Sequence, residues 1–224
     1  MNNRPFIQEI ALQGTINSFN LIAARESRIY LILGMKGSGK TALGFRLMEN
    51  LGMTKNKKMF AYGFPGMSLP SDIIKIDDFH ALENNSILII DEGGISFDAK
   101  NHFSFNNRQL KTLMVLSRHK QIDLIIINQN SSSIDLNIIR LADVLIFKEQ
   151  SLLQIEMERP QIVKLFGEAS EYFKGRFAKK FAFIVSKEFK GLVRNCLPSF
   201  WNEQISNGFS EMVFEKEKVK EIRI

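Results

Sequence analysis

The residues with the clearest chemistry lie at 34–41, which read Gly-Met-Lys-Gly-Ser-Gly-Lys-Thr and match the pattern G-x-x-x-x-G-K-[ST]. Glycines in such a loop let the backbone bend, so that successive N–H groups point at phosphate oxygens. Lys40 is expected to reach the β and γ phosphates, and the Thr41 hydroxyl is expected to coordinate Mg²⁺. The residues predicted to bind the nucleotide are Gly34, Met35, Lys36, Gly37, Ser38, Gly39, Lys40, Thr41 and Ala42.

The segments around this loop have the character that the motif requires. An apolar run at 29–33 precedes it, and a stretch that can continue as a helix follows it. The helix N-terminus adds partial positive charge, which favours a bound phosphate. The loop therefore predicts binding of ATP with Mg²⁺, and the simpler alternative is a glycine-rich turn.

A second candidate element is the run Ser-Ile-Leu-Ile-Ile-Asp-Glu at 86–92, which is apolar until its last two residues. Such a run is typical of a strand buried on both faces of a parallel sheet. Asp91 at its carboxyl end is expected to support Mg²⁺, since active sites of open α/β sheets gather at strand ends. Glu92 is the natural group to polarise an attacking water, although it could instead cap the turn at Gly93-Gly94. This pair favours an ATPase of the RecA-like, additional-strand division.

The elements that must position these residues alternate along the chain. We predict strands at 29–34, 58–62, 73–76, 86–91, 123–128 and 143–148. We predict helices at 40–51, 106–119 and 135–141. Alternation of this kind indicates the α/β class, with a mainly parallel sheet between helices and right-handed crossovers.

The rest of the chain divides into flanking segments around a P-loop core at 29–158. Residues 1–28 are interpreted as an N-terminal strand or arm, and 159–224 as a small basic C-terminal extension packed on the core. Within that extension we predict a helix at 161–174 and a hairpin made by 181–185 and 191–193. The tail from Glu211 could form an amphipathic helix.

Composition is ordinary for a folded domain and excludes some classes of site. The chain has 224 residues, 45% of them hydrophobic and 24% charged, which is enough for one sizeable α/β domain. Its single cysteine, Cys196, excludes an internal disulfide and a cysteine-cluster zinc site. No apolar run has the length of a membrane span, and the first residues lack a signal-peptide core. We therefore expect a cytoplasmic location and no transmembrane segment.

The net charge of +6 is concentrated in one region. Residues 159–194 hold nine Lys or Arg and three acids, so basic and acidic residues cancel in the remainder of the chain. This composition is expected of a surface that faces a polyanion such as double-stranded DNA. A solvated basic face without a partner is the alternative.

A third segment, 116–130, reads Leu-Ser-Arg-His-Lys-Gln-Ile-Asp-Leu-Ile-Ile-Ile-Asn-Gln-Asn. A helix end, a buried strand and a terminal amide follow one another there, and the segments 131–140 and 142–147 continue the order. Together with the phosphate loop, this order resembles the HerA/FtsK superfamily of DNA-pumping ATPases. Within it the chain looks most like the small viral genome-packaging ATPases and the zonular occludens toxin-like ATPases. The resemblance covers about residues 28–150.

The resemblance implies roles for three further residues. Gln129 corresponds to the amide that senses the γ-phosphate, and Arg118 to the position from which the family projects an arginine finger into a neighbouring subunit. Arg140 is the second candidate for the finger. A finger supplied in trans can be worth about 10³–10⁵ in rate. For either arginine the alternative is an ordinary salt bridge.

The resemblance also implies a function and partners. It implies a RecA-like fold and a homo-oligomeric ring, a hexamer, that hydrolyses ATP to drive double-stranded DNA, as in the genome-packaging motor of a virus. The location would then be the host cytoplasm or the virion, with a capsid or membrane protein as a further partner. One alternative is an ATPase for virion or filamentous-phage assembly or secretion that acts on protein partners. Another is a nucleoside kinase, although such enzymes usually carry a zinc ribbon that Cys196 alone cannot build.

Overall fold

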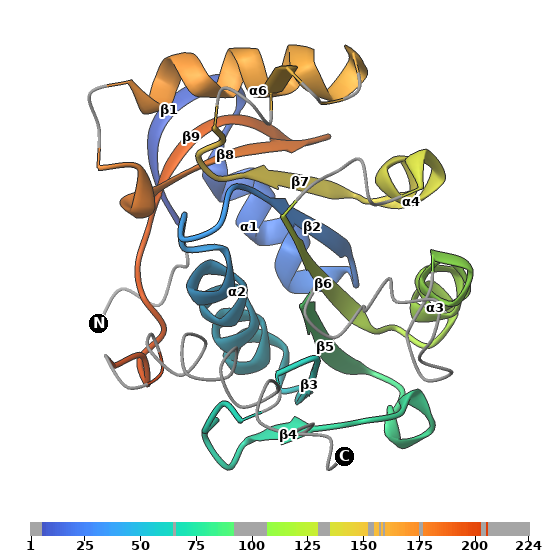
Figure 1. Ribbon diagram of the computed structural model, residues 1–224. Helices are drawn as coiled ribbons and strands as arrows, with labels where there is room; N and C mark the ends of the chain where they lie inside the picture. Colours follow the sequence, from blue (N-terminus) through green and yellow to red (C-terminus); the bar gives the residue numbers. More distant parts are fainter. Residues whose placement is uncertain are drawn as a thin grey trace, which may run out of the picture.

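The computed structural model describes residues 6–64, 66–91, 107–129, 135–151, 155–156, 158, 160–174, 177–202 and 205 (Figure 1). Its centre is a nine-stranded sheet with the order β1-β9-β8-β7-β2-β6-β5-β3-β4. The strands are β1 (Phe6–Gly14), β2 (Ile29–Leu33), β3 (Lys58–Tyr62), β4 (Ile73–Lys75), β5 (Ser86–Asp91), β6 (Asp123–Asn128), β7 (Val144–Phe147), β8 (Phe181–Ser186) and β9 (Phe189–Asn195).

The middle of the sheet is parallel and one side of it is antiparallel. Strand β2 pairs in parallel with both β6 and β7, and the parallel pairing continues through β5, β3 and β4. On the other side β8 runs antiparallel to β7, β9 to β8, and β1 to β9. Strand β2 is buried along its whole length, because it has a neighbour on each edge and helices over both faces.

Helices cover both faces of the sheet (Figure 1). One hydrophobic cluster packs α1 (Ile16–Arg25) and α2 (Lys40–Lys55) on one face. The other packs α3 (Asn107–His119), α4 (Leu136–Leu141) and α6 (Pro160–Phe173) on the opposite face. In the described part of the chain, the 3₁₀ turns η1 (Phe79–Ala81) and η4 (Ala178–Lys180) lie in the connections between strands. No helix in these described ranges is long and apolar enough to cross a membrane.

The predicted α/β class, with a mainly parallel sheet between helices, is confirmed. The predicted strands and helices of the core agree with those observed, except that α2 runs four residues beyond the predicted end, to Lys55. The hairpin also forms, and its strands β8 and β9 extend the main sheet. The sequence did not indicate α1, nor that β1 would pair with β9 at the far edge. The predicted tail helix lies outside the described residues.

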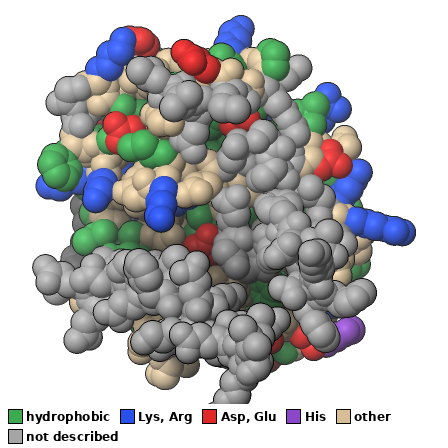
Figure 2. All heavy atoms as spheres, viewed as in Figure 1, with side chains coloured by type: hydrophobic (Ala, Val, Ile, Leu, Met, Phe, Trp, Pro, Cys, Tyr) green, Lys and Arg blue, Asp and Glu red, His purple; other side chains and the backbone are tan. Residues whose placement is uncertain are grey.

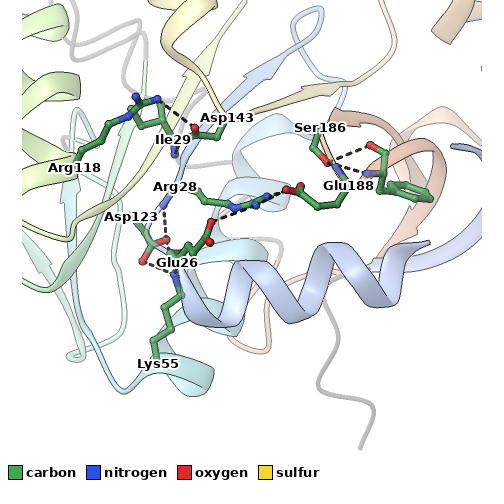
Figure 3. Close-up of polar contacts among 10 residues, drawn as sticks. Glu26, Arg28, Ile29, Lys55, Arg118, Asp123, Asp143, Ser186 and Glu188 are labelled. Atoms are coloured by element: carbon green, nitrogen blue, oxygen red, sulfur yellow. Dashed lines mark hydrogen bonds and ion pairs between the residues drawn. The ribbon is translucent and has the colours of Figure 1, made fainter. Parts of the chain in front are cut away.

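A buried cluster of charges holds together the edge of the sheet where the parallel strands begin (Figure 3). The carboxylate of Asp123, fully buried, accepts hydrogen bonds from the backbone N–H of Arg28 and from the ammonium groups of Lys55 and Lys57. Burial lowers the pKa of Lys55, and the charge of Asp123 opposes that shift. The cluster therefore ties the end of α2 and the residue before β3 to the residue before β2 and the first residue of β6.

A second ion pair joins the antiparallel hairpin to the same edge. The guanidinium of Arg28 donates to both carboxylate oxygens of Glu188, at 2.9 and 2.8 Å, in the turn between β8 and β9 (Figure 3). The hydrogen bond from Arg28 lowers the pKa of Glu188 and raises that of the guanidinium. Paired bonds of this kind fix orientation as well as distance, so the hairpin has a defined position against β2.

We expect Asp123→Ala to destabilise the protein by about 3–5 kcal/mol, because two buried ammonium groups lose their carboxylate. Chemical denaturation monitored by circular dichroism measures the change in the free energy of unfolding. Glu83→Ala is the matched control, since Glu83 and Lys58 form an exposed ion pair and its removal should cost about 1 kcal/mol or less. Equal destabilisation in the two variants would contradict the structural importance of the buried cluster.

Candidate nucleotide-binding site

The predicted phosphate loop lies between the end of β2 and the start of α2. Gly37 and Gly39 have φ angles of 79° and 88°, in the left-handed region that favours glycine. A Cβ added to Gly37 would meet nothing within 4 Å, so the backbone there is open to an incoming group. Helix α2 begins at Lys40 directly after Gly39, which directs the N-terminus of the helix at the loop.

The first glycine of the loop is required by packing. A Cβ on Gly34 would lie 2.6 Å from the Cβ of Lys148 and 2.8 Å from the Oγ of Ser38, which is closer than side chains tolerate. Gly34 therefore lets the loop approach the segment that follows β7. This contact supports the loop on the β7 side of β2, whereas β6 lies on the other side of that strand.

The lysine of the motif points into the loop. Lys40 is only 9% exposed, and its Nζ donates to the backbone oxygens of Gly34 at 2.7 Å and Met35 at 2.9 Å. The ammonium group is thereby held on the inner side of the loop. A group in this position can bind the oxygens of a polyphosphate that occupies the loop.

Two oxygen ligands suited to a divalent cation meet beside the loop. The Thr41 hydroxyl donates to a carboxylate oxygen of Asp91 across 3.3 Å, from the first turn of α2 to the carboxyl end of β5. Mg²⁺ prefers hard oxygen ligands and is usually held by one or two protein groups together with phosphates and water. These residues therefore fit Mg²⁺, which would supply charge neutralisation of the phosphates. No group of three or more metal-ligating side chains occurs in the described ranges.

The remaining predicted catalytic residues of this edge are Gln129 and Glu92. Gln129 is half-buried and follows β6 directly, and β6 lies between β2 and β5, so the amide lies at the edge that carries the loop and Asp91. Glu92 lies outside the described residues. The structure thus brings together the loop, Thr41, Asp91 and the position of Gln129.

Arg118 lies at the other edge of the sheet. It lies in the last turn of α3 and donates to the backbone oxygen of Leu141 at 3.0 Å and to the carboxylate of Asp143 at 3.2 Å. Asp143 in turn accepts from the N–H of Ile29, the first residue of β2 (Figure 3). The loop follows the last residue of β2, on the order of 15 Å further along the strand. Arg118 is therefore separated from the phosphate loop of its own subunit. Arg140, on α4, is exposed.

Lys148 is a site residue that the sequence did not reveal. It follows β7 immediately and is fully buried, yet it carries an ammonium group. Its Nζ donates to the backbone oxygens of Ala178 at 3.3 Å, Lys179 at 2.8 Å and Phe181 at 2.5 Å, and also lies 3.1 Å from the Oδ1 of Asn195. Burial lowers the pKa of Lys148 to about 7, and the charge of Glu149 opposes that shift. A lysine directly after an apolar strand was the only signal in the sequence.

Comparison with known proteins gives a fold and no close relative. No protein-family model matches the chain, and no curated protein matches its sequence. The genome packaging NTPase B204 of Sulfolobus turreted icosahedral virus 2 has 15% identity and a TM-score of 0.54, over 77% of this chain and 99% of that one. The pCW3 conjugation coupling protein TcpA has 13% identity and a TM-score of 0.59, over 84% and 65%.

A third similar structure is that of EssC (ATPases 2 and 3) from Geobacillus thermodenitrificans, with 14% identity and a TM-score of 0.50, over 94% of this chain and 48% of that one. The three resemble this chain in the arrangement of the sheet and helices at identities of 13–15%. A match at this level concerns the fold. The chain therefore has the RecA-like fold of the P-loop NTPases.

Proposed function

We propose that this protein binds and hydrolyses ATP. The observation that carries the proposal is the convergence of Lys40, Thr41 and Asp91 on one open loop at the carboxyl edge of the sheet. These are the groups that P-loop enzymes use to hold the phosphates and Mg²⁺. In this proposal Glu92 orients and deprotonates the attacking water, and Gln129 contacts the γ-phosphate.

We further propose that hydrolysis is coupled to movement of double-stranded DNA by a ring of identical subunits, a hexamer. The similar B204 structures are described as those of a genome packaging NTPase and a DNA-packaging ATPase, which supports this direction. The position of Arg118 supports a ring. This arginine lies far from the phosphate loop of its own subunit, so as a finger it would act on the phosphates bound by a neighbouring subunit. Its side chain is 52% exposed and its ion pair with Asp143 is a weak surface contact, so it can be exchanged for another partner.

The basic C-terminal region is less uniform than its composition indicated. Lys174, Lys190 and Arg194 form ion pairs with Glu171, Glu168 and Glu9, which reduces the charge available to an external polyanion. Lys179 and Lys180 belong to η4, beside the phosphate loop. Among the described residues of the region, the exposed Lys164 and Lys187 remain as candidates for contacts with DNA phosphates. The internal pairing also keeps open the alternative of an assembly or secretion ATPase that acts on a protein partner.

Lys40→Ala should abolish ATP binding or reduce it at least tenfold, because the phosphates lose the loop cation. Glu92→Gln should bind ATP and fail to hydrolyse it, since the change keeps the shape of the side chain and removes the base. Calorimetric titration and phosphate release measure the two effects. Lys58→Ala, at an exposed lysine of β3, is the control and should retain both properties. Loss of ATP binding in Glu92→Gln as well would assign that residue a structural role.

Arg118→Ala should leave the affinity for ATP within about twofold and remove most ATPase activity, because a finger acts on the phosphates of a neighbour. Mixing it with Glu92→Gln subunits should restore activity, since a mixed ring contains interfaces in which both groups are intact. Light scattering confirms that mixed oligomers form. Mixed rings without activity would argue against a finger at this position, and the same experiment with Arg140→Ala then tests the second candidate.

Neutralising Lys164 and Lys187 together should weaken DNA binding equally for all sequences, because phosphate contacts carry no base information. The plot of log affinity against log salt should become flatter, with its negative slope reduced in magnitude by about 0.9 for each DNA phosphate that the protein no longer neutralises. Filter binding across a salt series measures this slope. Lys174→Ala is the control, since Glu171 already pairs with that lysine. An unchanged slope in the double variant would direct the search for DNA contacts away from this region.

A further inference from the structure

The 3₁₀ turn η4 lies against the phosphate loop, although more than a hundred residues separate them in the sequence (Figure 1). A Cβ placed on Gly39 would be 3.7 Å from the backbone oxygen of Lys179 and 3.9 Å from the Cε of Lys148. Both distances are ordinary van der Waals contacts. The C-terminal segment therefore forms part of the wall beside the start of α2.

Lys148 holds η4 in this place. Its ammonium donates to the backbone oxygens of two residues within the turn and to that of Phe181, which directly follows it. It also contacts the amide oxygen of Asn195 at the end of β9. A buried ammonium is stable only when hydrogen-bond acceptors surround it. If η4 moved away, the ammonium would lose these acceptors or become exposed to solvent, which opposes such a movement. The backbone N–H of Lys148 also donates to the oxygen of Leu33, the last residue of β2. Lys148 thus connects η4 to the end of β2, directly before the phosphate loop.

The topology of the sheet decides which part of a nucleotide faces η4. Strand β6 lies on one side of β2, and β5 with Asp91 lies beyond it. Thr41 is directed to that side by its contact with Asp91, so Mg²⁺ and the terminal phosphates belong there. Strands β7 and β8 lie on the other side of β2, and η4 leads directly into β8. A nucleotide whose terminal phosphates face β5 extends its nucleoside toward β7, β8 and η4.

The residue before η4 offers an aromatic face at this position. Phe177 is 72% exposed, the largest exposure of any large hydrophobic side chain in the described part of the chain. The Nζ of Lys180 lies 5.8 Å from the centre of its ring. Lys36 in the loop and Lys179 and Lys180 in η4 are exposed, and Lys and Arg side chains are visible at several places on this face of the molecule (Figure 2). Positive charge beside an exposed ring suits a ligand that joins phosphates to an aromatic base.

We propose that Phe177 is the base-stacking residue of the nucleotide site, on a turn that Lys148 positions beside the phosphate loop. This inference rests on the proposed function, since it assigns the nucleoside part of the same site. Every base has a π face, so stacking on Phe177 contributes to the affinity for ATP and for GTP alike. Phe177 contacts the ligand directly, whereas Lys148 acts only through the backbone of η4.

The test compares ligands with and without a base. Phe177→Ala should weaken binding of Mg·ATP and Mg·GTP by about 5- to 150-fold, the range for removal of one base–aromatic stack. It should leave the affinity for Mg·tripolyphosphate within about twofold, because that ligand has no base. Isothermal titration calorimetry on the full chain measures all three ligands. Met53→Ala, at another exposed apolar position about 20 Å along α2 from the loop, is the control and should change none of them.

A second variant reads the stacking directly. Phe177→Trp should retain ATP affinity and show indole fluorescence quenched on addition of ADP, beyond any change that Trp201 alone gives in the unsubstituted protein. If Phe177→Ala binds ATP as tightly as the unsubstituted protein, or weakens ATP and tripolyphosphate equally, Phe177 does not stack on the base. If the unsubstituted protein binds neither ATP nor tripolyphosphate, the phosphate loop and the proposed function fail together.

Discussion

The backbone ladder between β2 and β7 continues past the end of both strands into the phosphate loop, and the site depends on that continuation. The N–H of Lys148 donates to Leu33 at 2.7 Å, and the N–H of Met35 donates to Glu149 at 2.9 Å. The loop is therefore registered against the neighbouring strand before it turns into α2. Because β2 is buried on both faces and paired on both edges, this geometry is supported from every side.

The edge of the sheet where the parallel strands begin and the edge where they end carry different kinds of polar group. At the edge where the parallel strands begin, buried ion pairs centred on Asp123 and Arg28 fasten helix and strand ends together. At the opposite edge β5 ends in Asp91, Gln129 follows β6, and the phosphate loop follows β2. The buried ion pairs that stabilise the fold therefore lie about one strand length from the residues proposed to bind the nucleotide. A substitution in one group leaves the other group in place.

The C-terminal hairpin contributes to the site as well as to the sheet. Asn195 at the end of β9 contacts Lys148, and residues that follow β9 contact the middle of α2. There the N–H of Ser199 donates to the buried carboxylate of Glu49 at 3.0 Å, and Phe200 packs edge-on against Phe45 at 5.7 Å. Helix α2 is therefore also held by the segment that follows β9, and Asn195 links that segment to Lys148. Residues beyond the region of family resemblance shape the proposed nucleoside end of the site.

Local pattern determined the elements, the parallel core and the phosphate loop, because glycine spacing and long apolar strands are properties of adjacent residues. Gly37, Lys40 and Asp91 could each be assigned from the sequence for that reason. Only the tertiary structure decided which distant segments meet: that β1 pairs with β9, that Arg118 lies at the edge away from its own loop, and that Lys148 is buried against η4. These contacts join segments far apart in the chain, and a lysine that needs four oxygens around it looks the same in the sequence as one on the surface.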